Sequence, residues 1–181
     1  MRILLIAAVD FELEAARRVW SAGEAAFLLG GVGAGSTRTV LEAALAADRY
    51  DRVLDIGIAG TCAERQFPLG SVVHVTADRH GEGDGSFLCN PAPWPELEFL
   101  PSCRANTLQT LDDRFRLPGA DVESMEGAAF FEVCLRAGVS FAQIRAVSNV
   151  VGVRDHALWD IPLSLKNLES ALQTLKTRLP K

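Results

Sequence analysis

The sequence has few cysteines, and none of them forms a recognisable pair. Cys62, Cys89, Cys103 and Cys134 are widely spaced, with no C-x-x-C motif and no histidine at zinc-finger spacing. A disulfide framework or a structural zinc site requires such groupings. We therefore interpret the cysteines as buried thiols, and we expect neither a metal nor an organic cofactor.

Long apolar runs and clusters of basic residues are also absent. The apolar residues 1–9 are too few to span a membrane, and no signal-peptide cleavage site follows them. The net charge is −5, with no stripe of Lys and Arg to oppose a phosphate backbone. We expect a cytoplasmic protein whose partners include neither membrane nor nucleic acid.

The remaining composition is that of a globular protein. The chain has 181 residues, of which 49% are hydrophobic and 23% are charged. This length and composition suit one domain with one substantial core. We expect residues 1–181 to form a single domain.

Apolar runs of strand length alternate with amphipathic stretches of helix length. Strands are predicted at 3–9, 25–32, 52–59, 71–77, 102–107, 120–123 and 140–147, and helices at 10–22, 36–47, 125–137 and 162–178. Residues 78–101, rich in Gly, Pro and charge, predict an irregular surface excursion. The alternation favours an α/β fold, in which ligands bind beyond the carboxyl ends of the strands.

Acidic and amide side chains follow several of these predicted strands. Asp10 and Glu12 come after the first, Glu123 and Glu126 after the sixth, and Asn149 after the last. A single acidic residue in such a place often complements a helix dipole. Several of them together favour a functional site.

Two glycine-containing turns also follow strands, at 31–33 and 57–60. Their glycines would let backbone N–H groups approach a ligand. Neither turn completes a dinucleotide fingerprint, because Ser36 occupies the position of the third glycine, and no Walker motif is present.

Four motifs in order resemble one superfamily. They are D-F-E-L-E at 10–14, G-I-A-G at 57–60, V-E-S-M-E-G-A-A at 122–129 and R-A-V-S-N at 145–149. Their order and spacing are similar to those of the purine nucleoside phosphorylases and the methylthioadenosine/S-adenosylhomocysteine nucleosidases. The resemblance implies a three-layer α/β/α sandwich with a central mixed, mostly parallel sheet. It also implies a homodimer or a larger homo-oligomer.

The same resemblance implies roles for individual residues. Glu126 would bind the ribose 2′- and 3′-hydroxyls, since a carboxylate accepts two hydrogen bonds from a vicinal diol, and Met125 would pack beneath the sugar. Glu12 would hold and deprotonate the attacking water. The alternatives are a helix-terminal charge for Glu126 and a surface charge for Glu12. The remaining pocket residues would be Gly57, Ile58, Ala59, Gly60, Asn106 and Thr107.

Asn149 stands where the adenine-specific members carry aspartate. An amide N–H₂ group suits the O6 or N7 of a 6-oxopurine, so hypoxanthine is the favoured base. The acid that protonates the leaving base is then less obvious. Alternatively, Asn149 is a loop residue that bonds its own backbone.

Residues 150–161 are similar to the futalosine hydrolases, members of this superfamily in menaquinone biosynthesis. Their substrate is an inosine-like nucleoside with a carboxyphenyl group on the 5′ side. Trp159 and Arg154 would suit that ring and its carboxylate. Alternatively, Arg154 is a surface charge and Trp159 a core or interface residue.

Three other functions stay open. A phosphorylase would need a cation for phosphate, and the glycine turns contain no arginine, although Arg38 lies one helical turn beyond the first. An adenine-specific nucleosidase is disfavoured by Asn149. A non-catalytic nucleoside-binding module is disfavoured by the presence of Glu12.

Overall fold

The computed structural model describes residues 1–62, 67–109, 117–153 and 155–180. These residues form strands β1 Ile3–Ala7, β2 Ala25–Leu29, β3 Arg52–Thr61, β4 Val72–His80, β5 Leu88–Cys89, β6 Ser102–Thr107, β7 Val122–Ser124 and β8 Ser140–Val150. The helices are α1 Asp10–Arg17, α2 Ala34–Ala47, α3 Gly127–Ala137 and α4 Ile161–Arg178, with short 3₁₀ turns η1 Pro95–Leu97 and η3 His156–Leu158.

The strands form one mixed sheet in the order β2-β1-β3-β7-β6-β4-β5, with β8 pairing with both β3 and β4. β8 is parallel to β3 and antiparallel to β4. Because β4 pairs with β6, β6 with β7, and β7 with β3, five strands close on themselves. We call β3, β8, β4, β6 and β7 the strand ring.

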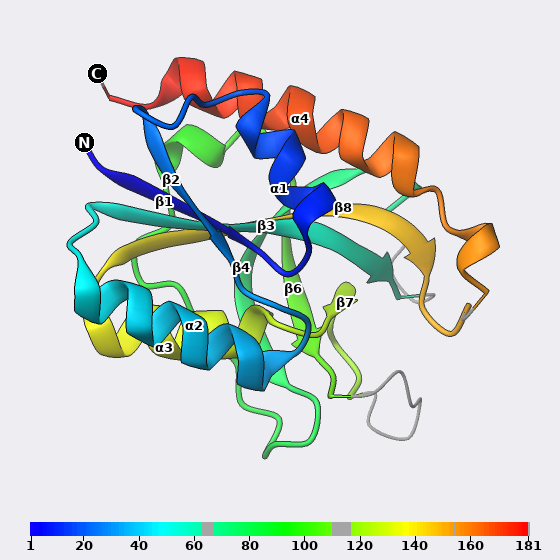
Figure 1. The fold of residues 1–181 in the computed structure, drawn as a ribbon. Helices are drawn as coiled ribbons and strands as arrows, with labels where there is room; N and C mark the ends of the chain where they lie inside the picture. Colours follow the sequence, from blue (N-terminus) through cyan, green and yellow to red (C-terminus); the bar gives the residue numbers. More distant parts are fainter. Residues whose placement is uncertain (63–66, 110–116, 154, 181) are drawn as a thin grey trace.

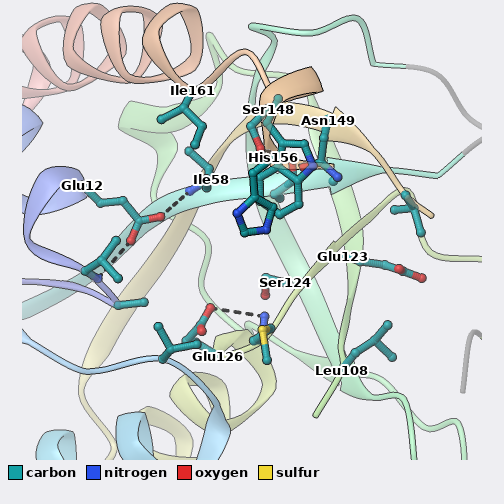
Figure 2. A pocket seen from close by; sticks show the side chains of 18 of the residues that line it. Glu12, Ile58, Leu108, Glu123, Ser124, Glu126, Ser148, Asn149, His156 and Ile161 are labelled. Carbon is teal, nitrogen blue, oxygen red and sulfur yellow. Dashed lines mark hydrogen bonds between the residues drawn. The ribbon is translucent and has the colours of Figure 1, made fainter. Parts of the chain in front are cut away.

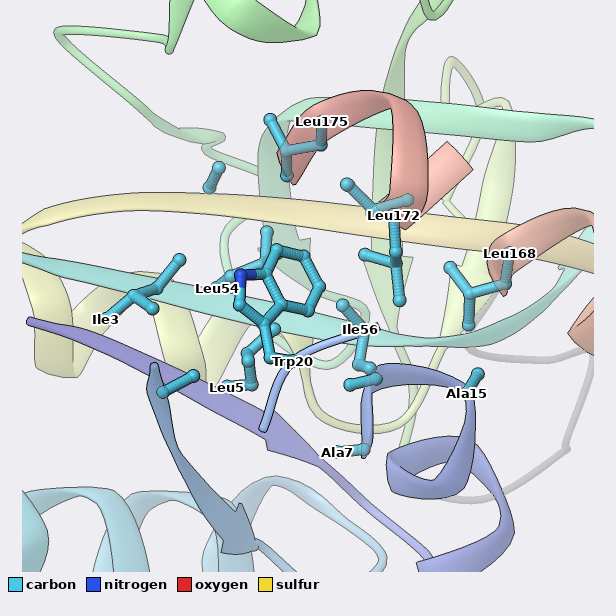
Figure 3. Close-up of a cluster of buried hydrophobic side chains, with 14 of the residues drawn as sticks. Ile3, Leu5, Ala7, Ala15, Trp20, Leu54, Ile56, Leu168, Leu172 and Leu175 are labelled. Carbon is cyan, nitrogen blue, oxygen red and sulfur yellow. The ribbon is translucent and has the colours of Figure 1, made fainter. Parts of the chain in front are cut away.

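Helices cover both faces of the sheet (Figure 1). α1 and α4 pack together on one face, and α2 and α3 pack together on the other. On α4, Leu168, Leu172 and Leu175 recur at helical spacing and are fully buried. They pack in the cluster that Figure 3 shows, with Trp20 and Ile56. The predicted three-layer α/β/α architecture with a mixed, mostly parallel sheet is confirmed.

The largest departure from the predicted elements is at 78–101. β4 continues to His80, and β5 pairs back on Ala77 and Asp78. Asp78 and Arg79 are buried and hydrogen-bonded inside the fold. Their charge had favoured a surface position in the prediction from sequence. This segment is therefore not the wholly irregular excursion that was predicted.

Element ends differ by smaller amounts. α1 ends at Arg17 rather than residue 22, because the chain turns to bury Trp20. β8 extends to Val150, so Asn149 lies in a strand rather than a loop. Cys62, Cys103 and Cys134 are buried as predicted, whereas Cys89 is exposed. Among the described helices, none is long and apolar enough to cross a membrane.

Candidate active site

A cavity of about 420 Å³ opens at the carboxyl ends of β1, β3 and β8 (Figure 2). It is lined by the start of α1, the end of β3, residues 123–126 and residues within 148–153 and 156–161. The neighbouring carboxyl ends of parallel strands place their loops together, as the sequence pattern predicts.

Glu12 lies in the first turn of α1, and its side chain turns inward. The residue is 4% exposed, which excludes a surface charge. The Ile58 N–H donates to Glu12 Oε1 at 2.8 Å, and the Val9 N–H donates to Oε2 at 3.3 Å. Two backbone donors on different elements therefore fix the carboxylate at the cavity wall (Figure 2).

The pKa of Glu12 reflects opposing influences. Burial raises it above its ordinary value, and the nearby Glu126 adds to the rise. The Arg145 guanidinium and the Ile58 N–H oppose that rise because both favour the charged form. A carboxylate whose pKa is raised toward neutrality is a stronger base than an exposed one.

Glu126 precedes α3 as its N-cap, yet its side chain makes no capping bond within that helix. Its Oε1 accepts from the Gly33 N–H at 2.9 Å, and its Oε2 accepts from the Met125 N–H at 3.2 Å. Gly33 has a φ of 93°, a conformation that favours glycine. The first glycine turn thus binds a protein carboxylate at the cavity, and Met125 lines the cavity beside it.

Asn149 lies near the end of β8 and also lines the cavity. Its Oδ1 accepts from the Ser148 hydroxyl at 2.9 Å, which fixes the amide orientation. Its Nδ2 donates to the Val150 carbonyl at 3.1 Å, so the alternative of a bond to nearby backbone holds in part. An amide nitrogen carries two hydrogens, and this bond uses one of them.

The second glycine turn divides between two roles. Ile58, Ala59 and Gly60 line the cavity. Gly57 lies behind it, where a Cβ would overlap both Glu12 Oε1 and Arg145 Nη1. The glycine at 57 therefore permits close packing of two charged side chains rather than approach of a ligand.

The structure places Asn106 and Thr107 behind the cavity. Asn106 accepts from Arg79 Nε at 2.7 Å and donates to the Leu117 carbonyl at 3.1 Å. Both residues are buried, and the neighbouring Leu108 lines the cavity instead.

Trp159 lines the cavity, and Arg154 lies outside the described residues. Trp159 Nε1 donates to the Val153 carbonyl at 2.9 Å. The His156 ring contacts the Trp159 ring with centroids 4.3 Å apart and also lines the cavity.

Sequence reasoning missed a buried ion pair beneath the cavity. Arg145 Nη2 donates to Asp55 Oδ2 at 2.5 Å, and their side chains are 1% and 3% exposed. Burial raises the pKa of Asp55 to about 8, while Arg145 opposes that rise. A charged residue inside a buried apolar strand is unfavourable unless it has a partner. Asp55 within V-L-D-I therefore indicates in the sequence that a buried cationic partner exists.

Comparisons with known proteins show which sequences this chain is similar to. Residues 102–179 match the sequence model of the phosphorylase superfamily. The futalosine hydrolase of Acidothermus cellulolyticus is 48% identical over 64 residues, which are 35% of this chain and 26% of that protein. The futalosine hydrolase of Streptomyces coelicolor is 32% identical over 136 residues, which are 75% of this chain and 54% of that protein. The matches thus span from about a quarter to about half of these relatives' length.

Solved structures share the whole fold. A futalosine hydrolase mutant of Helicobacter pylori has a TM-score of 0.84 at 15% identity, over 99% of this chain and 100% of that one. A methylthioadenosine/S-adenosylhomocysteine nucleosidase of Colwellia psychrerythraea, solved with adenine, has a TM-score of 0.83 at 15% identity, over 99% and 96%. At this identity the similarity establishes the fold.

Proposed function

Because the chain belongs to the phosphorylase superfamily, we propose that it is a nucleosidase that hydrolyses the bond between a purine base and ribose. The observation that carries the proposal is the presence of Glu12, Glu126 and Asn149 in one cavity. They suit a water-activating base, a diol acceptor and a donor to the purine, respectively.

The proposed reaction is a dissociative hydrolysis. Positive charge builds on the ribose as the glycosidic bond loosens, and water held by Glu12 attacks the anomeric carbon. The carboxylates of Glu12 and Glu126 stabilise charge that exists mainly in the transition state. Arg145, buried beneath Gly57, favours the ionised form of Glu12 that accepts the proton.

Hydrolysis is favoured over phosphorolysis by the position of Arg38. Its Nη2 donates to Glu132 Oε2 at 2.5 Å, so its charge is already paired on α3. A phosphorylase needs cationic groups that neutralise phosphate. The arginine nearest in sequence to the first glycine turn is therefore already paired with a carboxylate of the protein.

We infer that the substrate is futalosine, with release of hypoxanthine and dehypoxanthinyl futalosine in menaquinone biosynthesis. The futalosine hydrolase relatives and the amide at Asn149 support this choice. Trp159 and His156 form an aromatic wall suited to a carboxyphenyl group on the 5′ side. A homodimer and the contribution of Arg154 to this end of the cavity stay predictions.

The test is chromatographic detection of free base after incubation with futalosine, inosine or methylthioadenosine, each with and without phosphate. Phosphate-independent release of hypoxanthine from futalosine, faster than from inosine, is the expected result. Adenine release from methylthioadenosine would contradict futalosine as the substrate but would support the proposed hydrolysis. Base release that requires phosphate, or no release at all, would contradict the proposal.

A further inference from the structure

A buried polar chain runs through the strand ring beneath the cavity, with Asp78 at its centre. Asp78 lies on β4 and is fully buried. Its Oδ1 accepts from the Thr107 hydroxyl at 3.0 Å and from the Arg79 N–H at 2.8 Å. Its Oδ2 faces Gln143 on β8, which pairs with β4 in the ring. The carboxylate therefore contacts side chains from two neighbouring strands, β6 and β8.

The first arm of this chain leads to Glu126. The Thr107 hydroxyl has one hydrogen, which it donates to Asp78, so its lone pairs are left to accept. The Ala128 N–H donates to that oxygen at 2.7 Å. Gly127 sits directly on Asp78, since a Cβ there would overlap Asp78 Oδ2 and the Gln143 amide. Asp78 and Thr107 thus hold the first turn of α3, which Glu126 precedes.

The second arm leads to Glu12. Oriented to satisfy both neighbours, the Gln143 amide donates to Asp78 Oδ2 at 3.3 Å and accepts from Arg145 Nη2 at 3.0 Å and Nε at 3.1 Å. Arg145 Nη1 lies against Gly57 beside Glu12 Oε1. Gln143 therefore holds the guanidinium that favours the ionised form of Glu12.

Both arms depend on an acceptor at their shared end. Thr107 can accept from Ala128 because Asp78 takes its hydrogen, and Gln143 can present its oxygen to Arg145 because Asp78 takes its N–H. A carboxylate accepts on both oxygens, whereas an amide or a hydroxyl carries a donor. An ionised Asp78 therefore fixes the hydrogen-bond directions of both the Thr107 hydroxyl and the Gln143 amide.

We propose that Asp78 is a positioning residue that sets Glu126 through Thr107 and Glu12 through Gln143 and Arg145. The inference rests on the proposed function for its kinetic consequence, but the hydrogen bonds themselves can be tested without substrate.

Four variants separate the two arms. Asp78→Asn keeps a carbonyl oxygen that accepts from the Thr107 hydroxyl and the Arg79 N–H. Its new N–H₂ group then faces Gln143. The Gln143 oxygen must accept from that group, so the Gln143 N–H₂ group faces the Arg145 guanidinium. Gln143→Met removes the second arm alone, and Thr107→Val removes the first arm alone. Thr76→Val is the matched control, since this β4 hydroxyl bonds the Cys103 carbonyl at 3.3 Å outside the chain.

Amide hydrogen exchange in the ligand-free protein provides the first readout. It is measured at about pH 8, because burial raises the pKa of Asp78 to about 7. Loss of one hydrogen bond accelerates exchange by about fivefold. Asp78→Asn and Gln143→Met should accelerate the Ile58 amide, which bonds Glu12, and spare Ala128. Thr107→Val should accelerate Ala128 and spare Ile58, and Thr76→Val should affect neither.

Kinetics provide the second readout. Asp78→Asn and Gln143→Met should lower kcat by about tenfold with KM within about twofold, because they disturb the base. Thr107→Val should raise KM as well as lower kcat, because it disturbs the residue that binds ribose.

The outcomes separate this inference from the proposed function. A wild-type protein without turnover would end the proposed function, and the exchange pattern would still decide the coupling. Equal acceleration at Ile58 and Ala128 in every variant, or none in any, would overturn the coupling. If Asp78→Asn does not fold, Gln143→Met and Thr107→Val still test each arm with Asp78 in place.

Discussion

At the scale of single residues, Glu12 and Glu126, two of the glutamates that line the cavity, are held in different ways. Glu126 accepts from two backbone N–H groups of neighbouring turns. Glu12 also accepts from backbone donors, but it lies beside a buried arginine and its pKa is raised by burial. This difference suits one glutamate for binding a neutral diol and the other for accepting a proton.

Replacing Glu12 by Gln should lower kcat by about 10²–10⁴-fold, the range for loss of a general base. The side chain keeps its size and an oxygen for the Ile58 N–H, so nucleoside binding should stay within about tenfold. Steady-state kinetics and calorimetric binding measure the two effects. Glu14→Gln, at a partly exposed residue of the same helix that pairs with Arg17, is the matched control. Unchanged turnover in Glu12→Gln would exclude the mechanism.

The pH profile should show the raised pKa of Glu12. The reactive form is the carboxylate, so kcat/KM falls as pH falls through this pKa. Because burial raises the pKa, the fall should occur above the ordinary glutamate value of about 4.3. An acid limb at or below that value would show that another group titrates, or that Glu12 is not the base.

Asn149→Asp should shift the preference from hypoxanthine toward adenine by about tenfold, because the exchanged donor and acceptor then match a 6-amino group. The carboxylate would also face the Val150 carbonyl that now accepts from Nδ2, which favours a protonated acid able to donate. Competing release of the two bases from matched nucleosides measures the shift. An unaltered ratio would remove Asn149 from base recognition.

At the scale of elements, the order of strands and helices and the motifs could be predicted from sequence, because apolar periodicity and local turns are encoded locally. Glu12, Glu126 and Asn149 follow predicted strands, and the structure places all three in one cavity. The pairing of Arg145 with Asp55 could not be predicted, since Asp55 lies on β3 and reaches Arg145 only through strand pairing across a long sequence separation. Asp78 was assigned to an irregular segment for the same reason. A charged residue predicts a surface position unless its buried partners are known.

The junction of β7 and α3 makes its own prediction. Gly127→Ala should destabilise the fold by about 1–3 kcal/mol, although alanine favours helix by about 1 kcal/mol. The added Cβ would overlap Asp78 and Gln143. Gly35→Ala in α2 is the control, because no atom lies within 4 Å of its new Cβ, and it should be neutral or stabilising. Equilibrium unfolding in urea compares them, and equal effects would refute the close packing at Gly127.

At the scale of the whole molecule, His74 links folding to pH. It is 3% exposed on β4, its Nε2 has no hydrogen-bond partner among the described residues, and burial lowers its pKa to about 4. The unfolded chain therefore binds more protons between about pH 6.5 and 4. The stability contributed by neutral His74 is fully present above about pH 6.5 and is lost as pH falls toward 4.

The loss should reach roughly 3 kcal/mol in the free energy of unfolding. His74→Leu should flatten this part of the profile, because leucine carries no proton. Urea unfolding of both proteins between about pH 7 and 4.5 measures the difference. Parallel profiles for wild type and variant would assign the acid sensitivity to other groups.

The strand ring also determines when the edges of two strands become paired during synthesis. β8 closes the ring by covering edges of both β3 and β4, and it follows them in the chain by many residues. Until the ribosome has released Ser140–Val150, these two apolar strands expose unpaired backbone groups to other nascent chains. Emergence of β8 is therefore the step that pairs these strand edges, and the same step delivers Asn149 to the cavity.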